Sequence, residues 1–168
     1  MRTQSPFVYG FILVVFAVLQ NTLLTPLQIS QVRPEFTLLL LVFFAHQRGS
    51  MEGMIIGFIT GIVIDLLGIA PLGFHSLIYT IVGHIFGLTR GKMYVDAITM
   101  PVIFAVAATV LSILTALLIT LLFLPLRIPS VLSFSSLIQL GMHALSAPFI
   151  FGILRVSKLC RERDTQML

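Results

Sequence analysis

The sequence is poor in charge and cysteine, and it contains no tryptophan. Charged residues make up 10% of its 168 residues, whereas soluble proteins average about 25%. So few charges cannot coat a water-facing surface of this size, which excludes a soluble enzyme and a disordered tail. The single cysteine, Cys160, cannot form an internal bridge, which excludes a secreted disulfide scaffold, and no Cys/His pair has zinc-ligand spacing.

Hydrophobic residues make up 58% of the chain and gather in six runs. A membrane-spanning helix needs about 20 predominantly apolar residues, with a range of about 17 to 25. We therefore expect an all-α, polytopic membrane helix bundle that forms one domain over residues 1–168, with a basic tail over 156–168. The expected spans are 7–25, 34–47, 52–69, 72–89, 101–124 and 132–155.

The second span is the weakest of the six. Its apolar part, Phe36–Ala45, has only ten residues and would reach about 15 Å as a helix. It crosses the membrane if Pro34–Gln47 joins it or if the bilayer thins; otherwise it is a half-helix. Six spans are preferred, because the residues Gln47–Ser50 are typical of a hairpin turn on the cytoplasmic side. Five spans stay open as the alternative.

The basic residues orient the predicted bundle. Six spans with the N-terminus inside leave only Arg33 and Arg127 outside, so eight of the ten bases are cytoplasmic. Five spans with the N-terminus outside give the same ratio. The C-terminal tail is therefore expected in the cytoplasm, while the side of the N-terminus stays open. The bases form no continuous stripe of the kind that binds nucleic acid.

Glycines recur every four residues in two of the runs. Gly53, Gly57 and Gly61 follow this spacing in the third run, and Gly83 and Gly87 repeat it in the fourth. Without side chains at these positions two helix backbones can approach closely, which is a main source of packing in lipid. The spacing predicts packing between helices of this chain, with a partner's helix as the alternative.

Asp65 is the most unusual residue of the third run. A charged carboxylate within a membrane helix costs about 2.5–3.5 kcal/mol on insertion scales. It should therefore be paired, hydrogen-bonded or protonated. Three interpretations are open: a bond to a backbone amide or histidine at the turn into the fourth helix, a polar spot that faces a partner, or a proton or ion site.

Polar side chains also form two stripes at helical spacing. The stripes are Ser136, Gln139, His143 and Ser146 in the sixth run and Ser76, Thr80 and His84 in the fourth. They could bond one helix to another, which is favoured, or line a small cavity. No H-E-x-x-H or G-x-S-x-G motif is present. We predict no catalytic, cofactor or metal site.

An ordered set of motifs then places the chain beside a known family. The set is Arg33-Pro34-Glu35, the leucine-rich Phe36–Phe44, Gly57-x-x-x-Gly61-x-x-x-Asp65 and Pro71-Leu72-Gly73. In this order the motifs resemble the rod shape-determining protein MreD family, although the family often has Asp or Asn where Glu35 stands. The distinctive motifs cover Arg33–Gly91, while the length, short loops and basic tail are similar over nearly the whole chain.

The resemblance implies a non-catalytic scaffold in the bacterial cytoplasmic (inner) membrane that acts in the cell-elongation complex. Its implied partners are the bitopic protein MreC, the MreB filament, RodA and its class B penicillin-binding protein, together with membrane lipid. The implied fold is similar to the six-helix substrate-binding subunits of energy-coupling-factor transporters. The candidate residues for partner contact or for a structural polar site are Arg33, Pro34, Glu35, Asp65, Gly73 and His143.

A second function class stays open at this point. The polar stripes and the implied fold would also suit the substrate-binding membrane subunit of a small-solute, vitamin-type transporter. The absence of tryptophan and the scarcity of charge count against a tight vitamin pocket.

Overall fold

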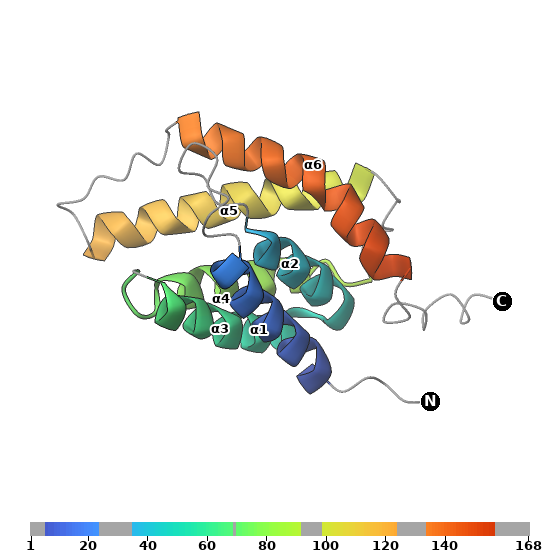
Figure 1. The fold of residues 1–168 in the computed structure, drawn as a ribbon, viewed down its shortest axis with the longest axis horizontal. Coiled ribbons are helices and arrows are strands. Elements are labelled where there is room, and N and C mark those ends of the chain that lie inside the picture. The colour runs from blue at the N-terminus through green and yellow to red at the C-terminus, as the bar shows by residue number, and fades with distance from the viewer. Residues whose placement is uncertain (1–5, 24–34, 69, 92–98, 124–133, 157–168) are drawn as a thin grey trace.

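The computed structural model describes residues 6–23, 35–68, 70–91, 99–123 and 134–156. Within these ranges the chain forms helices and no strand (Figure 1), so the predicted all-α fold is confirmed. The helices are α1 (Pro6–Leu23), α2 (Phe36–Arg48), α3 (Ser50–Leu67), α4 (Phe74–Gly87), α5 (Thr99–Phe123) and α6 (Phe134–Val156).

The helices follow the six apolar runs in order, but they differ in length. By length and composition α3, α5 and the 136–154 part of α6 can cross a membrane, whereas α1, α2 and α4 are shorter apolar helices in the described residues. That all six cross the bilayer stays a prediction. Arg33, Pro34 and most of the basic tail lie outside the described residues.

The two ends of the bundle carry different connections. Figure 1 shows α1 beginning and α6 ending at the same end, together with the turn between α2 and α3 and the end of α4. We call this the Gly49 end. The turn between α3 and α4 lies at the opposite end, which we call the Gly73 end.

Helix α2 lies at the centre of the bundle. Every residue from Thr37 to Ala45 is buried, and α2 packs against each of the other five helices. A helix that is apolar on all sides lies in a protein core or spans a membrane, and the burial of α2 places it in the core of this bundle. At 13 residues it is about 20 Å long, shorter than the hydrocarbon core of about 30 Å.

Helices α3 and α4 touch backbone to backbone along the glycine spacing. A Cβ atom added at Gly53 would lie 2.5 Å from the carbonyl oxygen of Gly83, a distance that real Cβ atoms essentially never show. The same collision, with backbone atoms of the facing helix, occurs at four further positions: Gly57 against Tyr79, Gly61 against Ser76, Gly83 against Gly53 and Gly87 against Ser50. The five glycines thus form the seam between α3 and α4.

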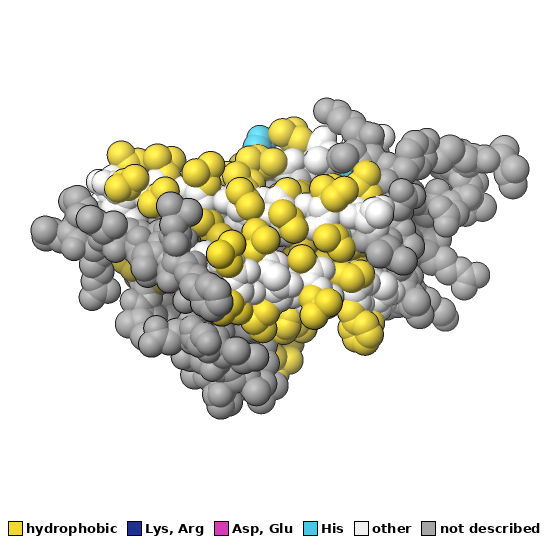
Figure 2. Space-filling model, turned by 90° about the horizontal axis from the view of Figure 1, so that it is seen from above, with side chains coloured by type: hydrophobic (Ala, Val, Ile, Leu, Met, Phe, Trp, Pro, Cys, Tyr) yellow, Lys and Arg dark blue, Asp and Glu magenta, His cyan; other side chains and the backbone are white. Residues whose placement is uncertain are grey.

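The outer surface is strongly apolar. Figure 2 shows one face on which the coloured side chains are almost all hydrophobic. Large apolar side chains of α5 and α6 stand well exposed, including Leu114 at 60%, Leu145 at 82% and Phe149 at 74%. Such a surface suits a lipid environment, because large exposed apolar patches are rare on soluble monomers.

Candidate functional site

Buried polar side chains collect where α2 and α4 begin. The first backbone N–H groups of any helix have no acceptor within that helix. Neither α2 nor α4 has a side-chain cap from its own N-cap residue, which is Glu35 in α2 and Gly73 in α4. Other helices supply the acceptors.

Asp65 of α3 caps the start of α4. Its Oδ2 atom accepts hydrogen bonds from the backbone N–H of Gly73 (2.9 Å) and from both the N–H and the hydroxyl of Ser76 (3.2 Å each). Its Oδ1 atom accepts from the N–H of His75 (2.9 Å) and lies 2.7 Å from Nδ1 of the same residue. A negative charge at a helix N-terminus also interacts favourably with the helix dipole.

These bonds bear on the three interpretations of Asp65. The side chain is fully buried, and both of its oxygens are bonded to residues of its own hairpin. This geometry favours the local structural interpretation over a spot that faces a partner. Gly73 takes part directly, since its backbone N–H donates to Asp65. Its φ of +96° is a left-handed conformation that glycine adopts without steric cost.

His143 of α6 caps the start of α2. The ring is fully buried, and Nε2 accepts a hydrogen bond of 2.8 Å from the backbone N–H of Glu35. Nδ1 lies 2.8 Å from the hydroxyl of Thr109, which itself donates to the carbonyl of Ala105 at 2.7 Å. Nε2 accepts a hydrogen bond, and the Thr109 hydroxyl hydrogen is donated to Ala105. Nδ1 therefore carries the ring hydrogen and donates it to the Thr109 hydroxyl oxygen.

Gln20 of α1 supplies a further acceptor for α2. Its Oε1 atom accepts hydrogen bonds from the backbone N–H of Thr37 (2.9 Å) and from the Thr37 hydroxyl (2.8 Å). Sequence reasoning did not select Gln20, Thr37 or Thr109 as site residues. The available signal was a glutamine near the end of one apolar run and a threonine near the start of the next.

A separate group of polar contacts ties the helices together at the Gly49 end. The Ser50 hydroxyl lies 2.5 Å from Nδ1 of His84, and Nδ1 of His46 lies 2.7 Å from the Thr89 hydroxyl. These contacts join α3 to α4 and α2 to the residues that follow α4.

Arginines complete this group. The guanidinium of Arg90 donates to the carbonyl of Arg48. The guanidinium of Arg48 lies 4.2 Å from the centre of the Tyr9 ring and 3.9 Å from the carboxylate of Glu52. Helices α1, α2 and α3 and the residues after α4 are therefore held together around the turn at Gly49.

Most described members of the two polar stripes bond helices or their own backbone. Ser76 bonds Asp65, His84 contacts Ser50, and His143 bonds Glu35. Thr80 and Ser146 donate to carbonyls of their own helices. Among the described residues, no group of three or more His, Cys, Asp or Glu side chains is placed to hold a metal ion.

The apolar exterior, the buried central helix and the internally bonded polar groups define the class as an α-helical integral membrane protein. Residues 1–157 match the family described as rod shape-determining protein MreD. The chain belongs to this family, and the prediction from the motif order is confirmed. Searches of curated proteins and of solved structures found no significant match. The expected likeness to energy-coupling-factor subunits therefore stays a prediction.

Proposed function

We propose that this protein is a non-catalytic scaffold of the rod-shape complex in the bacterial cytoplasmic membrane. In this role it binds an MreC-like bitopic protein and helps to position peptidoglycan synthesis, in the company of MreB, RodA and a class B penicillin-binding protein. The observation that carries the proposal is the match of residues 1–157 to a rod shape-determining family.

The chemistry of the buried polar groups supports a role without catalysis. Asp65 uses both of its oxygens to hold α4, and His143 uses both of its ring nitrogens. The hydroxyl of Ser76 donates to Asp65, so it is not arranged as a nucleophile beside His143. General-base catalysis needs a side chain within hydrogen-bond reach of the reacting proton. Asp65 and His143 are already engaged in holding helix starts.

The surface that we assign to the partner is the outer ridge of α6. Its residues are spaced by four and are exposed: Leu137, Gly141, Leu145, Phe149 and Ile153. Within the described ranges, a Cβ atom at Gly141 would meet nothing within 4 Å, which leaves room for another helix to approach. The basic tail, which follows α6 directly, would then meet cytoplasmic lipid or a cytoplasmic partner.

A matched pair of substitutions tests this assignment. Phe149→Ala removes an exposed ring from the α6 ridge, whereas Phe58→Ala removes an exposed ring from α3. We expect Phe149→Ala to lower recovery of the MreC-like protein in mild-detergent co-purification, with Phe58→Ala at the wild-type level. Equal recovery for both variants would reject the ridge. Recovery of ATPase subunits with a coupling protein instead of wall-synthesis proteins would reject the scaffold and favour the transporter.

A further inference from the structure

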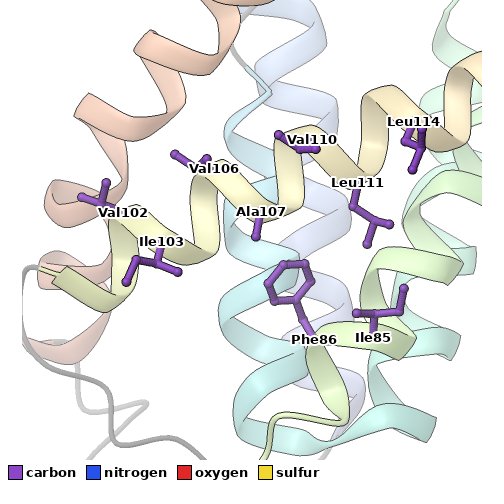
Figure 3. A pocket seen from close by; sticks show the side chains of 9 residues that line it. All are labelled: Ile85, Phe86, Val102, Ile103, Val106, Ala107, Val110, Leu111 and Leu114. Atoms are coloured by element: carbon purple, nitrogen blue, oxygen red, sulfur yellow. The ribbon is translucent and has the colours of Figure 1, made fainter.

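An open groove with an entirely apolar lining runs between α4 and α5 (Figure 3). It encloses about 640 Å³ and is lined by Ile85 and Phe86 of α4 and by residues of α5 from Val102 to Leu114. In Figure 3 the side chain of Ala107 points toward Phe86. Ala107 is the smallest side chain of the lining, so the groove owes much of its depth to this position.

The length of the groove matches one leaflet of a bilayer. Val102 and Leu114 are twelve residues apart on α5, which corresponds to about 18 Å along a helix. Half of the hydrocarbon core is about 15 Å. A transmembrane helix that docked here would need a groove through both leaflets, whereas the acyl chain of a lipid needs only one.

One end of the groove lies near the basic residues of the bundle. Val102 belongs to the first turn of α5, which begins at the Gly49 end in Figure 1. Ile85 and Phe86, from the last turn of α4, lie opposite Ala107 and Leu111 in Figure 3. Arg90 is exposed and follows Phe86 by four residues. Its bond to the Arg48 carbonyl places its guanidinium beside the α2–α3 turn, at the Gly49 end. An anionic headgroup is attracted to basic residues at a membrane surface.

We propose that this groove binds one acyl chain of an anionic phospholipid from the leaflet at the Gly49 end, with the headgroup beside Arg90. The apolar lining contacts the acyl chain, and the positive charge of Arg90 favours an anionic headgroup over a neutral one. The site is distinct from the α6 ridge assigned to the protein partner, so either assignment can fail without the other.

Native mass spectrometry of the purified protein with added lipid tests the groove. Ala107→Trp fills it, while Leu118→Trp adds the same ring at a position of α5 that is 57% exposed and outside the lining. We expect wild type and Leu118→Trp to bind one phosphatidylglycerol equally. Ala107→Trp should bind it about tenfold more weakly, or 1.4 kcal/mol.

Substitution of Arg90 tests the headgroup. Arg90→Gln should weaken phosphatidylglycerol binding about fivefold, because one base near an anionic surface contributes about 1 kcal/mol. Phosphatidylcholine binding should not change. Arg90→Lys retains the charge and controls for loss of the bond to the Arg48 carbonyl. Equal lipid binding by Ala107→Trp and Leu118→Trp would overturn the proposal, as would equal affinity of wild type for the two lipids. Loss of a second copy or a partner protein from Ala107→Trp, with lipid retained, would also overturn it.

Discussion

The α3–α4 pair and helix α6 use glycine in opposite ways. In α3–α4 an added Cβ would strike the facing backbone at each of the five seam positions. In α6 the same addition at Gly141 or Gly152 meets nothing within 4 Å among the described residues. Glycine therefore permits close contact only where a second helix is present to use it. Open glycines on α6 leave room that the described part of the chain does not fill.

The starts of α4 and α2 also differ, in how far along the chain their capping residues lie. Asp65 caps α4 from within the hairpin, through residues 8 to 11 positions away. The start of α2 is held by Gln20, 17 positions before Thr37, and by His143, 108 positions after Glu35. The α3–α4 hairpin supplies its own cap, whereas α2 depends on α1 and α6.

The largest effect is expected at the α3–α4 seam. Gly57→Leu places a side chain against the carbonyl of Tyr79, so the two backbones must separate. Overpacking costs typically about 1–3 kcal/mol and occasionally more, and here backbone must move rather than a side chain. We expect a large drop in the thermal unfolding temperature in detergent. Gly141→Leu is the control, and a comparable drop for it would contradict the comparison.

A smaller loss is expected from the cap of α4. Asp65→Ala leaves the N–H groups of Gly73, His75 and Ser76 without their acceptor. An unsatisfied buried group costs about 1–3 kcal/mol, so unfolding in denaturant should shift to lower concentration. Asp65→Asn retains one acceptor oxygen and should lose less. Unchanged stability with reduced recovery of the partner would instead make Asp65 a contact residue.

The cap of α2 should show coupling between distant helices. Gln20→Leu and His143→Leu each remove one acceptor from the start of α2. Each should cost about 1–3 kcal/mol. Because both hold the same short segment, the double variant should depart from additivity by about 0.5 kcal/mol or more. Strict additivity in a double-mutant cycle would show that the two caps act independently.

The smallest effect is expected at Gly152. Among the residues that the structure describes, an added methyl at Gly152 would meet nothing within 4 Å, so Gly152→Ala should lower the unfolding free energy by no more than about 0.5 kcal/mol. The same change at Gly53 would place Cβ 2.5 Å from the Gly83 carbonyl. Thermal scans of the two alanine variants, run side by side, measure this contrast. A loss at Gly152 equal to that at Gly53 would contradict it.

Local spacing made part of this structure predictable from the sequence. The six apolar runs predicted the helix order, and the four-residue spacing of Gly53, Gly57 and Gly61 pointed to the face that meets α4. A bond from Asp65 to the turn that follows was one of three open interpretations, because the groups that donate to its carboxylate lie only 8 to 11 residues further along the chain.

Contacts between distant segments could not be predicted in the same way. Nothing in the spacing of the sixth run selects Glu35 as the partner of His143 over any other backbone N–H. The central position of α2 was also not predictable, since a short apolar run fits a half-helix equally well. Its burial arises from packing against five other helices, which is a property of the whole bundle.

The cap of α2 has a consequence for how the protein is made. The chain is synthesised from the N-terminus, so α2 enters the membrane long before His143 exists. Until α6 is added, the N–H group of Glu35 lacks the acceptor that it has in the finished bundle. Helix α6 is made after the helix whose start it caps, so the central helix waits for a later segment before its first N–H group is satisfied.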